Sequence, residues 1–355
     1  MITTALLASL IITNVQNEQG PQYTYYALPK GMNPTAISDS GTIGAESPDG
    51  AVILKLDRST GEWTSGKSPY SGIVNQIDSN GRILAGGVIS NSQFEVLIQA
   101  FPDASKMYFR GLGDNGAVLG VHFASNSIGI SPSNVVLPWL MRQDGSILKM
   151  SIPAGYTPRS ARSIQINHRG QSALLADSKN IDDVTGKIYT VTSVLYYDEN
   201  GDYSGANVLP PHLSNSMTTS AEEGFDDSGN YFLTGKNANT LSSSHVIGYC
   251  LTRNGVLSQL SGAIPNSTFW TLDSNSRIAV GTIPRTADGS TTWGRAAILA
   301  LGQASYDLND LCTNLPANTE LIAASNVNKD GVIIGLARIG KNSKNLTGFV
   351  AFPTE

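Results

Sequence analysis

The sequence has 355 residues, of which 14% are charged, and its formal net charge at pH 7 is −5. Nucleic-acid binding requires basic patches, so this acidic balance, without any run of Lys or Arg, excludes that class of partner. Beyond the N-terminus no apolar stretch is long enough to span a membrane. The charged content is well below the usual quarter, and with abundant Gly, Ser, Asn and Thr it is typical of all-β proteins outside the cytoplasm.

The first twenty residues differ from the rest of the chain. An apolar run over residues 4–12 is followed by polar residues 13–19, an order that resembles the apolar core of a secretory signal. No basic residue precedes the run, and no clear small-x-small cleavage site follows it. We interpret residues 1–20 as an export segment and residues 21–355 as one domain. A mis-assigned start, or a strand lying against that domain, are the alternatives.

From residue 37 onward the chain repeats one short motif about seven times. An apolar residue is followed by Asx or Ser, a polar pair, Gly, and an apolar run that often contains a second Gly. The copies are Ile37–Gly41, Ile77–Gly81, Leu112–Gly116, Ile166–Gly170, Phe225–Gly229, Leu272–Ser276 and Val327–Gly331. Their spacing of roughly 35 to 60 residues is that of propeller blades and other repeat arrays.

Each copy predicts a tight β-hairpin, because Asn-Gly, Asp-Gly and Ser-Gly pairs accept the positive φ of a hairpin turn. We expect the polar residues of the motif to bond their own backbone within that turn. A second hairpin follows in several repeats, with turns at Leu56–Gly61, Arg142–Gly145, Asp198–Gly201 and Thr252–Gly255. Two hairpins give four strands per repeat, which is the blade of a β-propeller.

The two ends of the chain indicate how the ring closes. Residues 22–29 read as a strand that precedes the first repeat, and Thr347–Phe352 reads as a third strand with no fourth. Pairing these segments removes two open sheet edges. We therefore predict an all-β propeller of seven four-stranded blades, with the N-terminal strand completing the last blade. Six or eight blades remain open, because the second and sixth copies are irregular.

The repeat resembles that of the HAF-repeat family of bacterial extracellular proteins. The resemblance rests on Ala36–Gly44, Ile166–Ala176 and Val327–Gly335. The His-Ala-Phe tripeptide of the family is missing, and Gly348–Phe352 is its nearest equivalent. The resemblance implies an exported, propeller-like protein of poorly defined role, and it supplies no catalytic residues.

Long, varied connections are predicted on the face opposite the hairpin turns. They are residues 124–133, 177–186, 213–223, 236–245, 283–294 and 338–346. Long loops are often functional, and aromatic rings beside polar side chains suit sugars or polar polymers. The candidate ligand-binding residues are Tyr156, Arg159, His212, Arg285, Trp293 and Lys341. The alternative is that they are solvated loop residues.

The sequence offers no catalytic constellation. Its four His residues show no metal-ligand spacing, and no Ser lies in a Gly-x-Ser-x-Gly setting, so we assign no catalytic residue, metal ligand or cofactor. The acidic stretch Asp177–Asp183 is rich enough in oxygens for Ca²⁺, although it lacks the EF-hand order. Cys250 and Cys312 are predicted to lie too far apart for a disulfide.

Three functions fit these observations. The first is a secreted or surface-associated binding protein, a monomer, that presents the loop-rich face to a glycan or protein partner. The second is a polysaccharide lyase or glycoside hydrolase, which requires two acidic residues converging at the central channel, about 5 to 9.5 Å apart for hydrolysis. The third is a structural ring in a surface layer or a phage tail.

Overall fold

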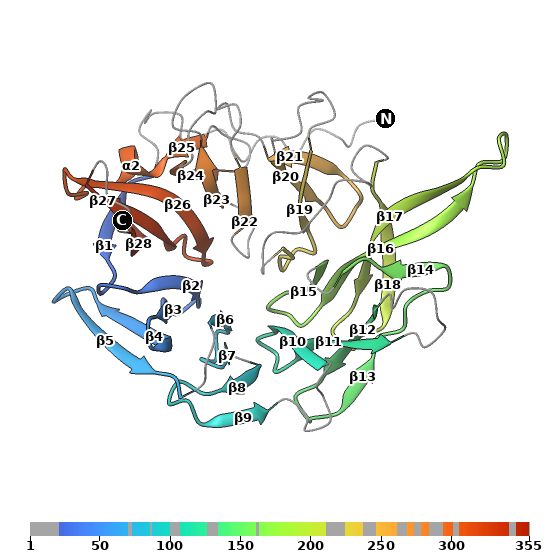
Figure 1. Ribbon diagram of the computed structural model, residues 1–355, viewed down its shortest axis with the longest axis horizontal. Helices are drawn as coiled ribbons and strands as arrows, with labels where there is room; N and C mark the ends of the chain where they lie inside the picture. The colour runs from blue at the N-terminus through green and yellow to red at the C-terminus, as the bar shows by residue number, and fades with distance from the viewer. Residues whose placement is uncertain are drawn as a thin grey trace, which may run out of the picture.

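The structure, a computed structural model, is a ring of small antiparallel sheets around a central axis (Figure 1). Seven sheets follow one another in chain order, each formed by consecutive strands except at the point of closure. The residues that the structure describes are 21–69, 73–85, 87–99, 107–125, 134–160, 163–210, 224–236, 246–260, 268–272, 278–283, 294–300, 305–340 and 346–354.

The first three blades each have four strands, which follow one another from the axis outward. Blade 1 consists of β2 (Asn33–Ile37), β3 (Ile43–Ser47), β4 (Gly50–Asp57) and β5 (Glu62–Lys67). Blade 2 consists of β6 (Val74–Ile77), β7 (Ile83–Ala85), β8 (Val88–Ser90) and β9 (Val96–Gln99). Blade 3 consists of β10 (Met107–Leu112), β11 (Val118–Ser125), β12 (Asn134–Met141) and β13 (Ile147–Lys149).

The next three blades vary this plan. Blade 4 splits its inner strand into β14 (Tyr156–Pro158) and β15 (Ile164–Ile166), followed by β16 (Ser172–Ile181), β17 (Ile188–Tyr197) and β18 (Tyr203–Val208). Blade 5 has β19 (Tyr231–Lys236), β20 (Val246–Leu251) and β21 (Leu257–Leu260), and a bridge from Phe225 to Tyr231 marks its inner position. Blade 6 consists of β22 (Thr268–Leu272), β23 (Ile278–Ile283), β24 (Arg295–Ala300) and β25 (Ser305–Asp307).

Blade 7 closes the ring with strands from both ends of the chain. Its order is β26 (Thr319–Val327), β27 (Ile333–Ile339), β28 (Leu346–Pro353) and β1 (Tyr23–Ala27), with Tyr25 opposite Ala351. The side chain of Asn314 holds the outer edge of β1, accepting from Tyr25 N at 2.7 Å and donating to Tyr25 O at 2.8 Å. The predicted seven blades and the predicted closure by the N-terminal strand are confirmed.

The repeated motif forms the turn between the first and second strands of a blade. Gly41 illustrates it: its N–H donates to Ser38 O at 3.0 Å, and Ser38 N–H donates to Thr42 O at 2.9 Å. The motif glycine has a positive φ in each described copy, from 76° at Gly81 to 94° at Gly116. The sequence prediction for these turns is therefore correct.

The core lies between neighbouring blades rather than in one central mass. One cluster joins Ile43 and Leu54 of blade 1 to Ile334 and Val350 of blade 7, and six further clusters continue around the ring. The second glycine of the motif allows this close packing, because a Cβ at Gly44 would lie 2.4 Å from Val74 Cγ1 of the next blade. Each blade is therefore stabilised mainly by its neighbours.

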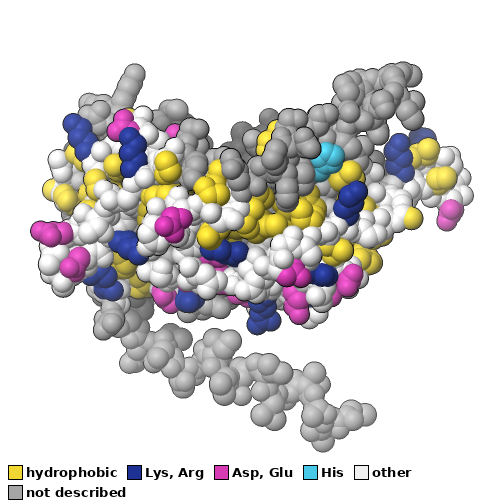
Figure 2. Space-filling view, turned by 90° about the horizontal axis from the view of Figure 1, so that it is seen from below, with side chains coloured by type: hydrophobic (Ala, Val, Ile, Leu, Met, Phe, Trp, Pro, Cys, Tyr) yellow, Lys and Arg dark blue, Asp and Glu magenta, His cyan; other side chains and the backbone are white. Residues whose placement is uncertain are grey.

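One predicted loop is wrong. The sequence predicts a long connection over residues 177–186, but β16 continues to Ile181 and β17 begins at Ile188. The resulting hairpin projects from the ring (Figure 1), with Val184 94% exposed at its tip. Cross-strand pairing, from Asp177 opposite Thr192 to Ile181 opposite Ile188, extends the strands outward where the sequence alone suggests polar loop residues. Figure 2 shows acidic and basic side chains interspersed along one side of the ring.

Two remaining predictions concern the cysteines and the membrane. Cys250 and Cys312 are both free and buried, which confirms the prediction that they form no disulfide. Cys312 directly follows the short helix α2 (Leu308–Leu311). Among the described residues no helix is long and apolar enough to cross a membrane.

Candidate functional site

In five of the described motif copies the side chain of the first polar residue supports its own turn: Ser38, Asp78, Asn167, Asp226 and Asn328. Asn328 Oδ1 accepts from Asp330 N at 3.1 Å and from Val332 N at 2.9 Å, and Asp226 Oδ1 accepts from Ser228 N and Asn230 N. This is the role that the sequence predicts for the polar residues of the motif. The amide group adds a second bond, since Asn328 Nδ2 donates to Ser38 O of blade 1 at 3.0 Å.

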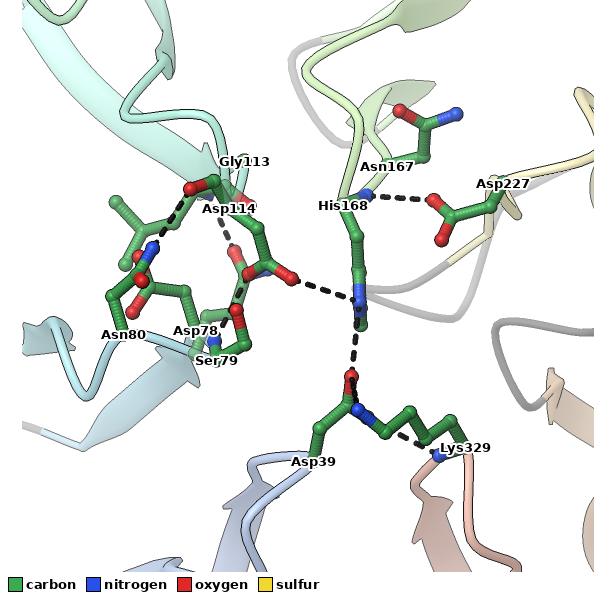
Figure 3. A network of polar contacts seen from close by, with 12 residues as sticks. Asp39, Asp78, Ser79, Asn80, Gly113, Asp114, Asn167, His168, Asp227 and Lys329 are labelled. Carbon is green, nitrogen blue, oxygen red and sulfur yellow. Dashed lines mark hydrogen bonds and ion pairs between the residues drawn. The ribbon is translucent and has the colours of Figure 1, made fainter.

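The second polar residue of the motif has a different role, because it bonds the preceding blade. Asp39 Oδ1 accepts from Lys329 N at 3.2 Å, and Asp114 Oδ1 accepts from Ser79 N at 2.9 Å. Asp227 Oδ1 accepts likewise from His168 N at 3.0 Å. These bonds fix one oxygen of each carboxylate and tie adjacent turns together (Figure 3).

The same position brings charged side chains together at the axis. His168 of blade 4 places Nδ1 3.4 Å from Asp39 Oδ2 of blade 1 and 3.5 Å from Asp114 Oδ2 of blade 3 (Figure 3). Lys329 of blade 7 adds its Nζ, 3.4 Å from Asp39 Oδ2. We call Asp39, Asp114, His168 and Lys329 the axial cluster. Four blades thus meet at one end of the ring axis.

Asp39 is the most enclosed member of the axial cluster, with 7% of its side chain exposed. Burial alone would raise its pKa. The polar contact with His168, the charge of His168, and the backbone N–H and charge of Lys329 together outweigh burial and hold the pKa of Asp39 below its ordinary value of 3.8. The Asp39 carboxylate is therefore ionised at neutral pH.

A pocket opens beside the axial cluster on the same face, between blades 4 and 5. Its volume is about 250 Å³. The lining residues come from turns and strand ends of both blades: Arg169, Gln171, Tyr196, Tyr197, Asp198, Ser204, Phe225, Asp227, Ser228, Gly229 and Arg253. Asp227 connects the pocket to the axial cluster, because it accepts from the backbone of His168.

Two guanidinium groups dominate the pocket. Arg253 stacks over the Tyr196 ring at 4.1 Å and donates to Ser204 O and Oγ, so its orientation is fixed. Arg169 is exposed and makes no hydrogen bond or ion pair with the described part of the chain. Burial raises the pKa of Tyr196 to about 12, so its hydroxyl is neutral near pH 7. The pocket presents donors from the arginines beside the acceptor oxygens of Asp198 and Asp227.

The predicted ligand-binding residues lie elsewhere or outside the described residues. Tyr156, in β14, packs half-buried against the core between blades 3 and 4. Arg159 places Nε 3.6 Å from Asp177 Oδ2. His212, Arg285, Trp293 and Lys341 lie outside the described residues. The structure therefore does not bring Tyr156 and Arg159 to the axial cluster.

The acidic stretch predicted as oxygen-rich enough for Ca²⁺ is divided between two parts of the β16–β17 hairpin. Asp177 Oδ1 accepts from Thr192 Oγ1 across the strands at 2.7 Å. Asp182 Oδ1 accepts from Val184 N and Thr185 N in the turn. The two carboxylates are thus engaged separately, and a Ca²⁺ site here stays a prediction.

The axial cluster is absent from the sequence predictions although its signal is present in the motif. Its members Asp39, Asp114, His168 and Lys329 all occupy the second polar position. In a ring this position recurs around one axis, so residues up to 290 apart in sequence meet. An alignment of the motif copies therefore identifies the cluster from the residues at the second polar position.

No protein-family model matches the chain, and no curated protein matches it. Among solved structures the chain is similar to YCF48 bound to a D1 peptide, at 13% identity over 96% of this chain and 97% of that chain, with a TM-score of 0.49. The chain is also similar to a puromycin hydrolase, at 13% identity with a TM-score of 0.47. This similarity covers 90% of this chain and 50% of the hydrolase chain. A gluconolactonase from Xanthomonas campestris is 12% identical over 75% of this chain and 92% of that chain, with a TM-score of 0.38. The strand order itself defines the chain as a seven-bladed β-propeller.

Proposed function

We propose that the protein is an exported glycan-binding propeller, and that one sugar unit of the glycan occupies the pocket between blades 4 and 5. The observation that carries this proposal is the lining of that pocket. Guanidinium, hydroxyl, amide and carboxylate groups converge over buried aromatic rings within about 250 Å³. Drug-sized ligands need about 300–1,000 Å³, so this volume suits a single unit of a polymer.

The chemistry of the pocket matches that of a sugar. Sugar hydroxyls both donate and accept hydrogen bonds, and the pocket offers donors at Arg169 and Arg253 together with acceptors at Asp198 and Asp227. Arg253 is already oriented by Tyr196 and Ser204, which lowers the entropic cost of ordering it on binding. A ligand carrying only negative charge would meet the two carboxylates, and this favours a hydroxyl-rich ligand.

Binding is favoured over hydrolysis by the geometry at the axis. The hydrolase alternative requires two carboxylates about 5 to 9.5 Å apart. Asp39 and Asp114 do meet there, but their oxygens lie within 4.8 Å of each other and both contact His168. Each Oδ2 is thus directed at the imidazole of His168, and the two carboxylates are closer than the about 5 to 9.5 Å that hydrolysis needs. Export is supported by the low charged content of 14%.

The opposite, loop-rich face remains the alternative position for the ligand. That hypothesis depends on Trp293 and its neighbours, and only Tyr156 and Arg159 of the predicted set fall within the described residues. Both of these already have partners within the fold. The pocket between blades 4 and 5 is therefore the first site to test.

The test is a glycan array with the full chain, followed by titration calorimetry of the best glycan against three variants. Arg169→Ala removes a pocket guanidinium that makes no hydrogen bond or ion pair with the described residues, and we expect at least tenfold weaker binding. Lys55→Ala removes one exposed positive charge from β4 in blade 1 and serves as the matched control, with unchanged affinity. Trp293→Ala tests the loop-rich face.

The outcomes separate the hypotheses. Loss of affinity only in Arg169→Ala supports the pocket, whereas loss only in Trp293→Ala moves the site to the loop-rich face. An array without any bound glycan contradicts the proposal and favours a protein partner or a structural ring. Concentration-dependent assembly on a sizing column would then distinguish the ring from the protein-binding alternative.

A further inference from the structure

We propose that Asp39, Asp114 and His168 bind a divalent transition-metal ion at the axis of the ring. Among the described residues these three side chains each offer a donor atom, and the three atoms lie within 4.8 Å of one another. The inference is independent of the glycan pocket, because it uses different side chains and a different probe.

The spacing of the donor atoms is that of ligands around a common ion. His168 Nδ1 lies 3.4 Å from Asp39 Oδ2 and 3.5 Å from Asp114 Oδ2. These distances are longer than the 2.7–3.2 Å typical of a direct N–H···O hydrogen bond. Ligands bonded to zinc at about 2.0–2.2 Å in tetrahedral geometry lie about 3.3–3.6 Å from one another. The observed pairs fall within this interval.

The carboxylates are oriented in advance. Asp39 and Asp114 each use Oδ1 to accept a backbone N–H of the preceding blade, from Lys329 and from Ser79. Each therefore directs Oδ2 toward His168 (Figure 3). Such outer contacts orient the metal ligands and raise metal affinity. Because the ligands come from blades 1, 3 and 4, the ion would also brace the ring across its axis.

Lys329 is a competitor for the same position. Its Nζ lies 3.4 Å from Asp39 Oδ2, and its side chain is 46% exposed. A cation entering the cluster repels this ammonium group, whose side chain is partly exposed to solvent. The charge of Lys329 should therefore weaken metal binding, and removing that charge should strengthen it.

The donor set indicates the class of ion. One imidazole nitrogen with two carboxylate oxygens suits Zn²⁺ and neighbouring transition metals, whereas Mg²⁺ and Ca²⁺ prefer oxygen ligands alone. Three protein ligands leave at least one coordination position for water.

The experiment is calorimetric titration of the full chain at pH 7.5 with ZnCl₂ and, separately, with MgCl₂. We expect one equivalent of Zn²⁺ to bind and no measurable Mg²⁺ binding at the same concentrations. Asp114→Asn keeps the oxygen that accepts from Ser79 N but loses the charge, and His168→Asn loses the imidazole. We expect each of the two to bind Zn²⁺ at least tenfold more weakly.

Two further variants make the result specific. His122→Ala removes a histidine of β11 outside the cluster and should bind as the wild type does. Lys329→Met keeps the length of the side chain without its charge and should bind at least threefold more tightly. X-ray absorption of the zinc-loaded protein should show nitrogen and oxygen neighbours at about 2.0–2.2 Å.

The inference is overturned by any of three results. The first is a wild type that takes up no stoichiometric Zn²⁺. The second is equal affinity in the wild type, Asp114→Asn and His168→Asn, provided circular dichroism shows that both variants are folded. The third is zinc binding that is lost in His122→Ala, which would place the ion elsewhere.

Discussion

His168 Nδ1 lies 3.4 Å from Asp39 Oδ2, although the two residues belong to blades 4 and 1, which are not neighbours in the ring. The main packing contacts between blades join each blade to the next one in the ring, so a contact across the axis adds a separate constraint. It gathers the carboxylate of Asp39, the imidazole of His168 and the ammonium of Lys329 at one point. The stability of the ring should therefore depend on the charge of Asp39.

Asp39→Asn tests that dependence. The native environment lowers the pKa of Asp39 below 3.8, so its ionised form contributes stability above that pH, and the contribution is lost as pH falls through the lowered native pKa. The substituted amide can still accept from Lys329 N but carries no charge, and we expect a loss of about 1–2 kcal/mol at pH 7. The measurement is urea unfolding at pH 7 and pH 3, and the difference in stability between the two proteins should be smaller at the lower pH. A constant difference at both values would contradict the electrostatic explanation.

Asp226→Asn should change the free energy of unfolding at pH 7 in the opposite direction to Asp39→Asn. Burial raises the pKa of Asp226, despite its bonds from Asn230 and Ser228, and nearby Asp227 raises it further. The native state therefore favours the protonated carboxyl, and wild-type stability falls as pH rises from 3.8 through the raised native pKa. Asn occupies the same motif position at Asn167 and Asn328, so the turn accepts it. We expect unfolding free energy at pH 7 equal to or above that of the wild type, and a smaller change between pH 4 and pH 7.

These two aspartates show what the sequence does and does not reveal. Asp226 occupies the first polar position, and its bonds to its own turn follow from local turn chemistry alone. Asp39 occupies the second position, and its partner Lys329 is 290 residues away in sequence. Local propensity is therefore sufficient for the hairpins and for the blade count, but the axial cluster depends on closure of the ring.

The β16–β17 hairpin illustrates a second limit. Residues 177–186 carry polar residues that resemble a loop, yet Asp177 pairs with Thr192 and Asn180 with Tyr189 across the strands. The strands extend this far because of cross-strand pairing, and the polar composition of the segment does not predict that pairing. The pocket between blades 4 and 5 likewise cannot be predicted from local sequence, because its lining residues come from turns that are about 55 to 60 residues apart along the chain.

Closure of the ring leads to a third prediction. Asn314 bonds both backbone groups of Tyr25, at 2.7 Å and 2.8 Å, and so covers the open edge of β1. Asn314→Ala leaves a half-buried N–H and C=O without these partners, and we expect a cost of about 1–3 kcal/mol. Urea unfolding measures this cost, and limited proteolysis should show earlier cleavage near residues 21–27. Asn318→Ala, in the same connection to β26, is the control. If both variants cost the same, Asn314 has no particular role in closure.

The two glycines of the motif should differ sharply in their tolerance of alanine. Gly41 has a φ of 77°, and a Cβ there would meet no atom within 4 Å, so Gly41→Ala should cost only the left-handed backbone conformation, about 1–2 kcal/mol. At Gly335 a Cβ would lie 2.1 Å from Ala323 O and 2.7 Å from Phe349 Cε1. The strands β26 and β27 would have to separate, so Gly335→Ala should cost more than Gly41→Ala, in the range of about 3 kcal/mol or above that is typical of severe core disruption.

Chemical unfolding of both variants gives the comparison, and the soluble yield of Gly335→Ala gives a second readout. Equal, small costs would show that blade 7 can relax around an added methyl group, in which case the second glycine of the motif reflects turn propensity rather than packing.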